Sequence, residues 1–413
     1  MRGSIDFERN AREYPATRKS KSSKVSINIK KPSAIYPVKS CTRKKRELLI
    51  AGCLLLLAFM AAATSPAQVK WKGKVVKEGN VTVVKNPSDP LYKSPVFELK
   101  QDLSLGGPNA QGKDVFNRIG EFVVDDAGNF YISDRMEDHV KVFDRSGRYL
   151  RTIGRRGQGP GELDGMGSLS IVRTTGELTV QNVRKKCLSF FKADGTYLRD
   201  LPFEERRINF VHLDSKGNIY AGETIIETGT SRSEFRMVIL NPEAKLLQIL
   251  AKAPGADRSK FELFMPNPYW TVDLSDNLVY GYSETYDIRF FEAGTHRLFK
   301  RILKDFDPVP VTEQEKSGFQ KPELKELNMV FAKKHAAFRS FCVSDTGHLF
   351  VETFEKAENG LFVHDIFDRE GILLARVPLR PRGLKVCDGK LYALEEDEEG
   401  YQTVKRYSVT WKY

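Results

Sequence analysis

The chain has 413 residues, of which 40% are hydrophobic and 29% are charged, and this composition excludes a disordered or fibrous protein. A formal net charge of +12 at first favours a nucleic-acid partner. However, residues 1–47 carry 14 Lys or Arg against 4 Asp or Glu, whereas from Gln68 onward 52 basic residues face 50 acidic ones. The folded part is therefore almost neutral, and the argument for nucleic acid is lost.

An uncharged apolar segment, residues 48–67, follows the basic leader 1–47. Its apolar core is shorter than the ~20 residues of a comfortable membrane span, and small residues end it at Ser65 and Ala67. This order predicts an export signal cleaved near Ala67. Two alternatives stay open: an uncleaved signal anchor, and lipidation at Cys53 in the lipobox-like IAGC. In each case we expect the body of the protein to be periplasmic, secreted or tethered facing outward, with membrane contact only through a retained N-terminal segment.

Residues 68–93 are expected to be a linker, and residues 94–413 the folded domain. The domain opens with SPVFELKQDLSL at 94–105, a strand-like segment with no neighbouring partner in the sequence.

A repeat then fills the rest of the chain. Each copy holds an alternating strand, a turn of the Asp/Ser-x-Gly type, a second strand, a loop, and a further hairpin, as in EFVVDDAGNFYISD followed by HVKVFDRSGRYLRTI. Six copies are visible, and the last one lacks its final strand. The first turn carries a glycine in five of them: Gly128, Gly176, Gly217, Gly347 and Gly389.

A four-stranded unit repeating every roughly 40 to 50 residues is typical of a β-propeller blade. The sequence therefore predicts an all-β, six-bladed β-propeller of four-stranded antiparallel blades. The segment 94–105 would supply the strand missing from the sixth blade. Closing the ring in this way leaves no unpaired edge between the first and last repeats.

The stretch DRSGRYLRTIGRRGQGPGEL resembles the strand-and-linker signature of NHL-type repeats, and residues 94–413 resemble the secreted bacterial six-bladed β-propellers. The resemblance implies the fold; the activity stays open, because the wider superfamily contains lactonases, lyases and binding scaffolds. Gly157, Gly159 and Gly161 are flanked by strands, with no helix start to hold a phosphate group. This stretch is interpreted as a linker between blades.

One helix is predicted between the fourth and fifth blades, over residues 322–335. Pro322 suits a first helical turn, and apolar residues follow at helical spacing from Leu324 to Phe331. Such a helix would either line the mouth of the propeller or cover a blade edge.

Candidate metal ligands come from one position of the repeat, six residues after the first-turn glycine. There the second strand of each blade ends near one face of the ring, at Asp134, Asn182, Glu223 and Glu395, with Thr353 and Ser283 in the remaining blades. A ring of oxygen-bearing side chains is what Ca²⁺ or another hard divalent cation needs, and the resembling lactonases hold a cation in a propeller mouth. Strand ends near exposed loops also favour polar residues, so a purely structural role is the alternative.

Candidate ligand-binding residues come from the start of the first strand of each blade. Arginines recur there at Arg118, Arg206, Arg207, Arg339, Arg380 and Arg382. Guanidinium groups suit a carboxylate, sulfate or phosphate, although they also pair with nearby acidic residues on a solvated rim. Tyr269 and Tyr282 could stack on a sugar or a peptide.

Three functions remain open. The first is an exported binding module that presents an arginine-rich mouth to an anionic small molecule, a glycan or a partner protein. The second is a cation-dependent hydrolase or lactonase that uses the ring of oxygen ligands. The third is a structural scaffold of the cell envelope.

Overall fold

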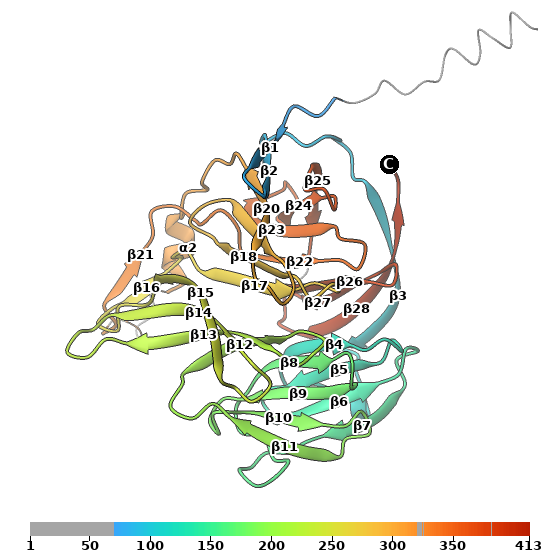
Figure 1. Ribbon diagram of the computed structural model, residues 1–413. Helices are drawn as coiled ribbons and strands as arrows, with labels where there is room; N and C mark the ends of the chain where they lie inside the picture. The colour runs from blue at the N-terminus through green and yellow to red at the C-terminus, as the bar shows by residue number, and fades with distance from the viewer. Residues whose placement is uncertain (1–69, 320–323, 325, 381) are drawn as a thin grey trace, which may run out of the picture. The chain divides into compact units, whose positions relative to one another are not determined.

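The computed structural model describes residues 70–319, 324, 326–380 and 382–413, and the leader 1–47 and the apolar segment 48–67 lie outside this range. The described residues form a β-propeller of six blades (Figure 1). The first three blades are antiparallel sheets of four strands each. Blade 1 contains β4 (Ile119–Val124), β5 (Phe130–Asp134), β6 (His139–Phe143) and β7 (Tyr149–Ile153). Blade 2 contains β8 (Met166–Val172), β9 (Glu177–Asn182), β10 (Cys187–Phe191) and β11 (Tyr197–Pro202). Blade 3 contains β12 (Ile208–Leu213), β13 (Ile219–Ile226), β14 (Ser233–Leu240) and β15 (Leu246–Pro254).

Blades 4 to 6 repeat the pattern, and blade 6 takes its outer strand, β3, from the start of the domain. Blade 4 contains β17 (Pro268–Val272), β18 (Leu278–Tyr282), β19 (Asp287–Phe291) and β20 (Leu298–Lys304). Blade 5 contains β22 (Ser340–Val343), β23 (Leu349–Lys356), β24 (Phe362–Phe367) and β25 (Leu373–Leu379). Blade 6 contains β26 (Arg382–Cys387), β27 (Lys390–Glu396), β28 (Gln402–Trp411) and β3 (Phe97–Gly106). The predicted fold class is confirmed, including closure by the N-terminal strand. In Figure 1, β3 lies beside β28, from the other end of the chain, with which it pairs antiparallel from Phe97 opposite Trp411 to Gly106 opposite Thr403.

The first turn of blade 1 shows why the repeat often carries Asp and Gly there. In blade 1 a carboxylate oxygen of Asp125 accepts hydrogen bonds from the backbone N–H groups of Ala127 and Asn129 at 3.0 and 2.8 Å. Gly128 completes the turn at φ +82°, a conformation that glycine adopts at little cost. The turn thereby sets the register of β4 against β5.

The hydrophobic core lies between the blades. Each of six clusters joins two neighbouring sheets, as where Val140 and Val142 of blade 1 pack with Leu178 and Val180 of blade 2. A blade buries its faces only against its neighbours, so the ring is the folding unit.

Residues 74–86 differ from the expected linker. They form a hairpin, β1 (Lys74–Glu78) and β2 (Val81–Asn86), and β2 pairs in parallel with β20, extending blade 4 to six strands. In Figure 1 this hairpin lies against β20 although more than two hundred residues separate them in the sequence. The alternating valines of the hairpin find a partner only in the folded ring, so a linker was the wrong interpretation of these residues.

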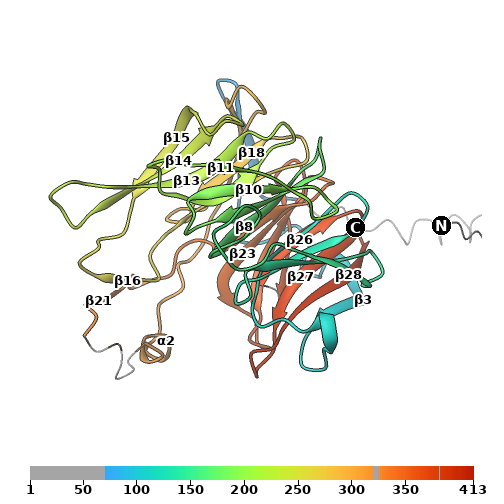
Figure 2. The same cartoon turned by 90° about the horizontal axis from the view of Figure 1, so that it is seen from below.

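The helix predicted over residues 322–335 is also wrong in its described part. Met329–Phe331 is a short strand, β21, that pairs in parallel with β16 (Phe261–Leu263). The helix between blades 4 and 5 is instead α2 (Glu313–Ser317), which Thr312 and Glu315 cap reciprocally. Another short helical segment, the 3₁₀ turn η1 (Gly112–Asp114), precedes blade 1. Figure 2 shows α2, β16 and β21 together beside the blades. Within the described residues, no helix has the length and apolar character to cross a membrane.

Candidate functional site

The four candidate metal ligands are buried, and each bonds to its own blade or to the segment that enters it. Asp134 is 1% exposed, and its carboxylate accepts the backbone N–H groups of Asn117, Arg118 and Met136 at 2.8, 3.1 and 3.2 Å. It therefore fixes the loop that leads into β4.

Asn182 does the same for the connection between blades 1 and 2. Its side-chain amide donates to the carbonyl of Glu162 at 3.1 Å, and its oxygen accepts the N–H of Asp164 at 2.9 Å. Both groups of the amide are thus used by the backbone of the incoming loop.

Glu223 and Glu395 are balanced by cations from their own blades. Arg206 donates to Glu223 at 2.7 Å, and Lys405 lies 2.8 Å from a carboxylate oxygen of Glu395, whose other oxygen accepts the hydroxyl of Tyr407. In the described part of the chain, no group of three or more His, Cys, Asp or Glu side chains could hold a metal ion. At this register position Asp134, Asn182 and Glu223 bind the segment that enters their blade, whereas Glu395 binds two residues of β28.

The candidate arginines have different surroundings. Arg118 and Arg207 are exposed, whereas Arg339 pairs with Glu352 at 3.0 Å and its guanidinium lies 3.7 Å from the ring centre of Phe362. Arg206 is held by Glu223. Arg380 lines a small second pocket, and the side chain of Arg382 lies outside the described residues. Of these arginines, Arg207 combines exposure with a place in the larger pocket described below.

Tyr269 and Tyr282 belong to the packing of blade 4. Tyr269 is half-buried, its ring centre is 5.8 Å from that of Phe338, and burial raises its pKa. Tyr282 packs on the cluster between blades 3 and 4, and burial raises its pKa too. The structure does not bring either ring into the pocket of Arg207.

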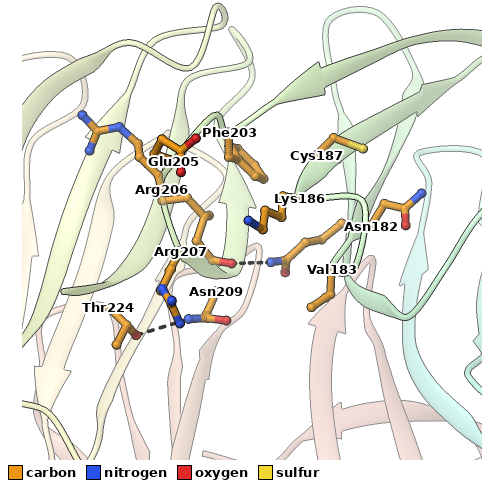
Figure 3. A pocket seen from close by; sticks show the side chains of 12 residues that line it. Asn182, Val183, Lys186, Cys187, Phe203, Glu205, Arg206, Arg207, Asn209 and Thr224 are labelled. Carbon is orange, nitrogen blue, oxygen red and sulfur yellow. Dashed lines mark hydrogen bonds between the residues drawn. The ribbon is translucent and has the colours of Figure 1, made fainter. Parts of the chain in front are cut away.

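A pocket of about 510 Å³ opens between blades 2 and 3 (Figure 3). Most of its wall is polar: amides, a hydroxyl, three cationic groups and one carboxylate surround a smaller apolar part. The lining residues most relevant to binding are Gln181, Asn182, Lys186, Arg206, Arg207, Asn209 and Thr224. The pocket therefore contains three residues that the sequence singled out, Asn182, Arg206 and Arg207, and several that it did not.

The charge of the pocket is positive on balance. The pair between Arg206 and Glu223 is neutral, which leaves the exposed Lys186 and Arg207 against the exposed Glu205. In Figure 3 the side chain of Arg207 points to the same side of the pocket as Asn209 and Thr224, which are themselves linked by a 3.4 Å hydrogen bond.

Buried hydrogen bonds and an ion pair hold the strands that form the wall of the pocket. The Gln181 amide donates to the carbonyl of Ile208 at 2.8 Å, which ties blade 2 to the first strand of blade 3. The buried Glu223 holds Arg206, the residue before Arg207. Binding groups placed on a rigid support lose less conformational entropy when they meet a ligand.

The residues that sequence reasoning missed lie next to ones it found. Thr224 follows Glu223, Asn209 follows the arginine pair by two residues, and Lys186 lies in the turn after Asn182. Their proximity depends on how blades 2 and 3 meet, which a repeat found along one chain does not specify.

A second pocket of about 270 Å³ lies at blade 6. Arg380 and Lys405 contribute to it together with Glu395, Glu396 and Asp397. Acidic residues outnumber basic ones, and the buried Glu395 already binds Lys405, so this pocket is a poorer site for an anion.

Comparison with known proteins gives a family and a fold. A family model of six-bladed β-propellers, DUF5128, matches residues 115–378. Among solved structures, the chain is similar to a putative exported protein from Bacteroides fragilis, with 13% identity and a TM-score of 0.52, over 80% of this chain and 100% of that one. It also matches a DUF4221 family member from Bacteroides vulgatus, with 10% identity and a TM-score of 0.45, over 76% of this chain and 99% of that one. Among curated proteins there is no matching sequence.

Proposed function

Because this chain belongs to the DUF5128 family of six-bladed β-propellers, we propose that its rigid ring is an exported binding module. Its site is the pocket between blades 2 and 3, and its ligand is a small anionic molecule or the anionic group of a glycan. The observation that carries this proposal is the pair of exposed cations, Lys186 and Arg207, above a polar wall.

Export rests on the basic leader and the apolar segment that follows it. The similarity to a protein described as putatively exported agrees with it. An exported binding protein would meet its ligand at the cell surface or in the periplasm.

Arg207 would bind the anionic group, since its planar guanidinium presents paired donors to a carboxylate or a sulfate. Lys186 would add a second positive charge, and Asn209 and Thr224 would hydrogen-bond neutral parts of the ligand. We expect attraction by this basic mouth to weaken as salt is added, because the two cations are exposed.

The test compares Arg207→Ala with Arg297→Ala, which removes an exposed arginine from the outer turn of blade 4. Purified protein is titrated calorimetrically with whichever carboxylate, sulfate and phosphate probes raise its melting temperature in a screen. We expect Arg207→Ala to weaken binding about tenfold, the value of a charge-assisted hydrogen bond of ~1.5 kcal/mol, while Arg297→Ala leaves it unchanged. Equal binding by both variants would contradict the proposal.

A further inference from the structure

Blades 1 and 2 have the same turn between their second and third strands. The turn is residues 135–138 in blade 1 and residues 183–186 in blade 2, and the strand ends that flank it pair in the same way. The last residue of each turn has a positive φ, +51° for Asp138 and +53° for Lys186. Lys186 therefore occupies in blade 2 the position that Asp138 has in blade 1.

The carboxylate of Asp138 is bound at the junction of blades 1 and 2. Asp138 is 4% exposed, and its two oxygens accept the backbone N–H of Gly165 at 3.1 Å and the Nε–H of Arg156 at 3.0 Å. Both donors come from the connection that enters blade 2, and Gly165 is the last residue before β8. A carboxylate at this junction is thus held by one guanidinium group and one backbone N–H.

The junction of blades 2 and 3 offers the same donors to an outside carboxylate. Arg207 takes the place of Gly165, because each precedes the first strand of its blade and each carbonyl accepts the N–H of the residue after the candidate metal ligand, at 3.0 and 2.9 Å. No hydrogen bond or ion pair among the residues that the structure describes involves the N–H or the guanidinium of Arg207, or the amino group of Lys186. A carboxylate partner at this junction would have to come from a ligand.

A shorter connection leaves room for that ligand. Strands β7 and β8 are joined by residues 154–165, whereas β11 and β12 are joined by residues 203–207 alone. The longer connection brings Arg156 to Asp138, and the shorter one leaves the pocket of about 510 Å³. In Figure 3 the amino group of Lys186 points toward the segment that enters blade 3. Both cations therefore line one space of the size that small ligands occupy.

Apolar side chains lie beside these cations. Val183, Phe203 and Ile208 contribute to the wall of the pocket, and the side chain of Val183 is 46% exposed. Blade 1 has Arg135 at the position of Val183. An accessible valine next to unpaired cations suits a ligand that carries an apolar body beside its anionic group.

We propose that the pocket binds a carboxylic acid with a small apolar body, and that it holds the carboxylate as the preceding junction holds Asp138. The backbone N–H of Arg207 corresponds to that of Gly165, and the guanidinium of Arg207 does the work of Arg156. A planar carboxylate matches these donors better than a tetrahedral sulfonate or phosphonate. This inference rests on the proposed function and narrows its ligand from anions in general to carboxylates.

Lys186→Asp tests the correspondence by placing the carboxylate of blade 1 in the pocket itself. Lys186→Asn is the matched control, because asparagine has nearly the same shape and also tolerates a positive φ but carries no charge. We expect Lys186→Asp to have the higher melting temperature of the two, since its carboxylate would be bound by Arg207. The same carboxylate should block the site, so we expect ligand affinity to fall more than about tenfold in Lys186→Asp and only about threefold in Lys186→Asn.

A second control separates this effect from a change in overall charge. Lys192→Asp makes the same change of charge in an outer turn of blade 2, where blade 1 has Asp144, and Lys192 does not line the pocket. We expect this variant to keep ligand affinity within about twofold.

The probes are benzoate, benzenesulfonate and phenylphosphonate, which share a phenyl ring and differ in the anionic group. Ligand-observed NMR titration gives their dissociation constants. We expect benzoate to bind about fivefold more tightly than the other two, and Arg207→Ala to abolish this preference.

Three results would overturn the inference: benzoate that binds no better than the other two probes or not at all, Lys186→Asp that is no more stable than Lys186→Asn, or Lys186→Asp that keeps its affinity for benzoate. If the sulfonate or the phosphonate binds best and still depends on Arg207, the proposed function stands and only the preference for carboxylates fails. If no bound probe depends on Arg207, the proposed function fails as well.

Discussion

The position six residues after the first-turn glycine holds a buried polar side chain that binds the segment entering the blade, and the kind of bond differs between blades. Asp134 binds backbone N–H groups, Asn182 binds both an N–H and a carbonyl, and Glu223 binds an arginine. Each solution satisfies a buried polar group beside the loop that enters the blade. The loops that form the mouth are therefore held from the interior, and the exposed residues on them are free to differ between blades.

His364 provides a titratable probe of the interior. It is 2% exposed on β24, its Nδ1–H donates to the carbonyl of Phe362 at 3.1 Å, and burial lowers its pKa to about 4, with Arg339 opposing protonation further and Asp365 favouring it. Because the unfolded chain binds the proton with an ordinary pKa near 6.5, the folded state loses stability as pH falls from about 6.5 to about 4. We expect this group alone to reduce the free energy of unfolding by about 2 kcal/mol between pH 7 and pH 4.5.

The measurement is urea unfolding at both pH values for the wild type and for His364→Gln, which is neutral throughout. The loss in the free energy of unfolding from pH 7 to pH 4.5 should be about 2 kcal/mol smaller in the variant. An equal pH dependence in both proteins would show that the pKa of His364 is the same in the folded and unfolded states, against this prediction. NMR titration of the ring would confirm that result independently.

At the level of residues, the sequence predicted positions better than roles. Counting six residues from the first-turn glycine leads to a buried polar residue in each of the five blades that carry this glycine, because a turn fixes the register of its two strands; the burial itself was not predicted. Whether those side chains converge depends on the angle between blades and on local partners such as Arg206 and Lys405. Neither is encoded in the repeat. The positive φ of Phe210 is likewise set by a bulge that only the paired strands reveal.

Among the elements, the β1–β2 hairpin connects two blades. The side chain of Asn86 donates to the carbonyls of Leu303 and Gly371 at 3.3 and 2.9 Å and accepts the N–H of Leu373 at 2.8 Å. One 2%-exposed amide thus joins the outer strands of blades 4 and 5. The hairpin covers an edge of blade 4 and also fastens that blade to its neighbour.

We expect Asn86→Ala to lower the free energy of unfolding by about 2 kcal/mol, because three backbone groups would lose their partner in a buried place. Thr82→Ala on the same strand is the control, since its hydroxyl accepts a bond from Lys77 at the exposed surface. It should cost less than about 0.5 kcal/mol. Chemical denaturation measures the free energy of unfolding of both variants. If both substitutions lowered it equally, Asn86 would not join blades 4 and 5 in the way we infer.

The two mispredicted elements have a common cause. The valine alternation of residues 74–86 is readable as a hairpin, but it lies outside the repeat and its partner β20 is distant in the sequence. The apolar spacing around Val330 and Phe331 suits a helix equally well, until pairing with β16 selects a strand. The short helix α2, by contrast, carries its own signal in the Thr312–Glu315 capping box. A capping box therefore predicts a helix from neighbouring residues alone. The structure of residues 74–86 and 329–331 depends instead on strands that are distant in the sequence.

At the scale of the whole molecule, the ring depends on a few residues at its seam. Strand β3 buries Phe97 and Leu105 to 4% and 3% exposure and pairs along the length of β28. Each of these side chains contributes about 1.5–3 kcal/mol by burial. The seam also covers an edge that would otherwise be open to another chain.

Two truncated chains separate the closing strand from the hairpin before it. A chain that begins at Ser94 lacks β1 and β2 but keeps β3, whereas a chain that begins at Gly107 also lacks the closing strand. We expect the first to unfold cooperatively at a moderately lower temperature, since the ring stays closed, all six blades keep both neighbours, and only the hairpin on blade 4 is lost. The second loses several kcal/mol of burial and exposes β28, so we expect broad unfolding and association in size-exclusion chromatography. If the second chain stayed monomeric with a sharp transition, the blades would be holding their arrangement without a closed ring, and stability would have to come from adjacent pairs of blades alone.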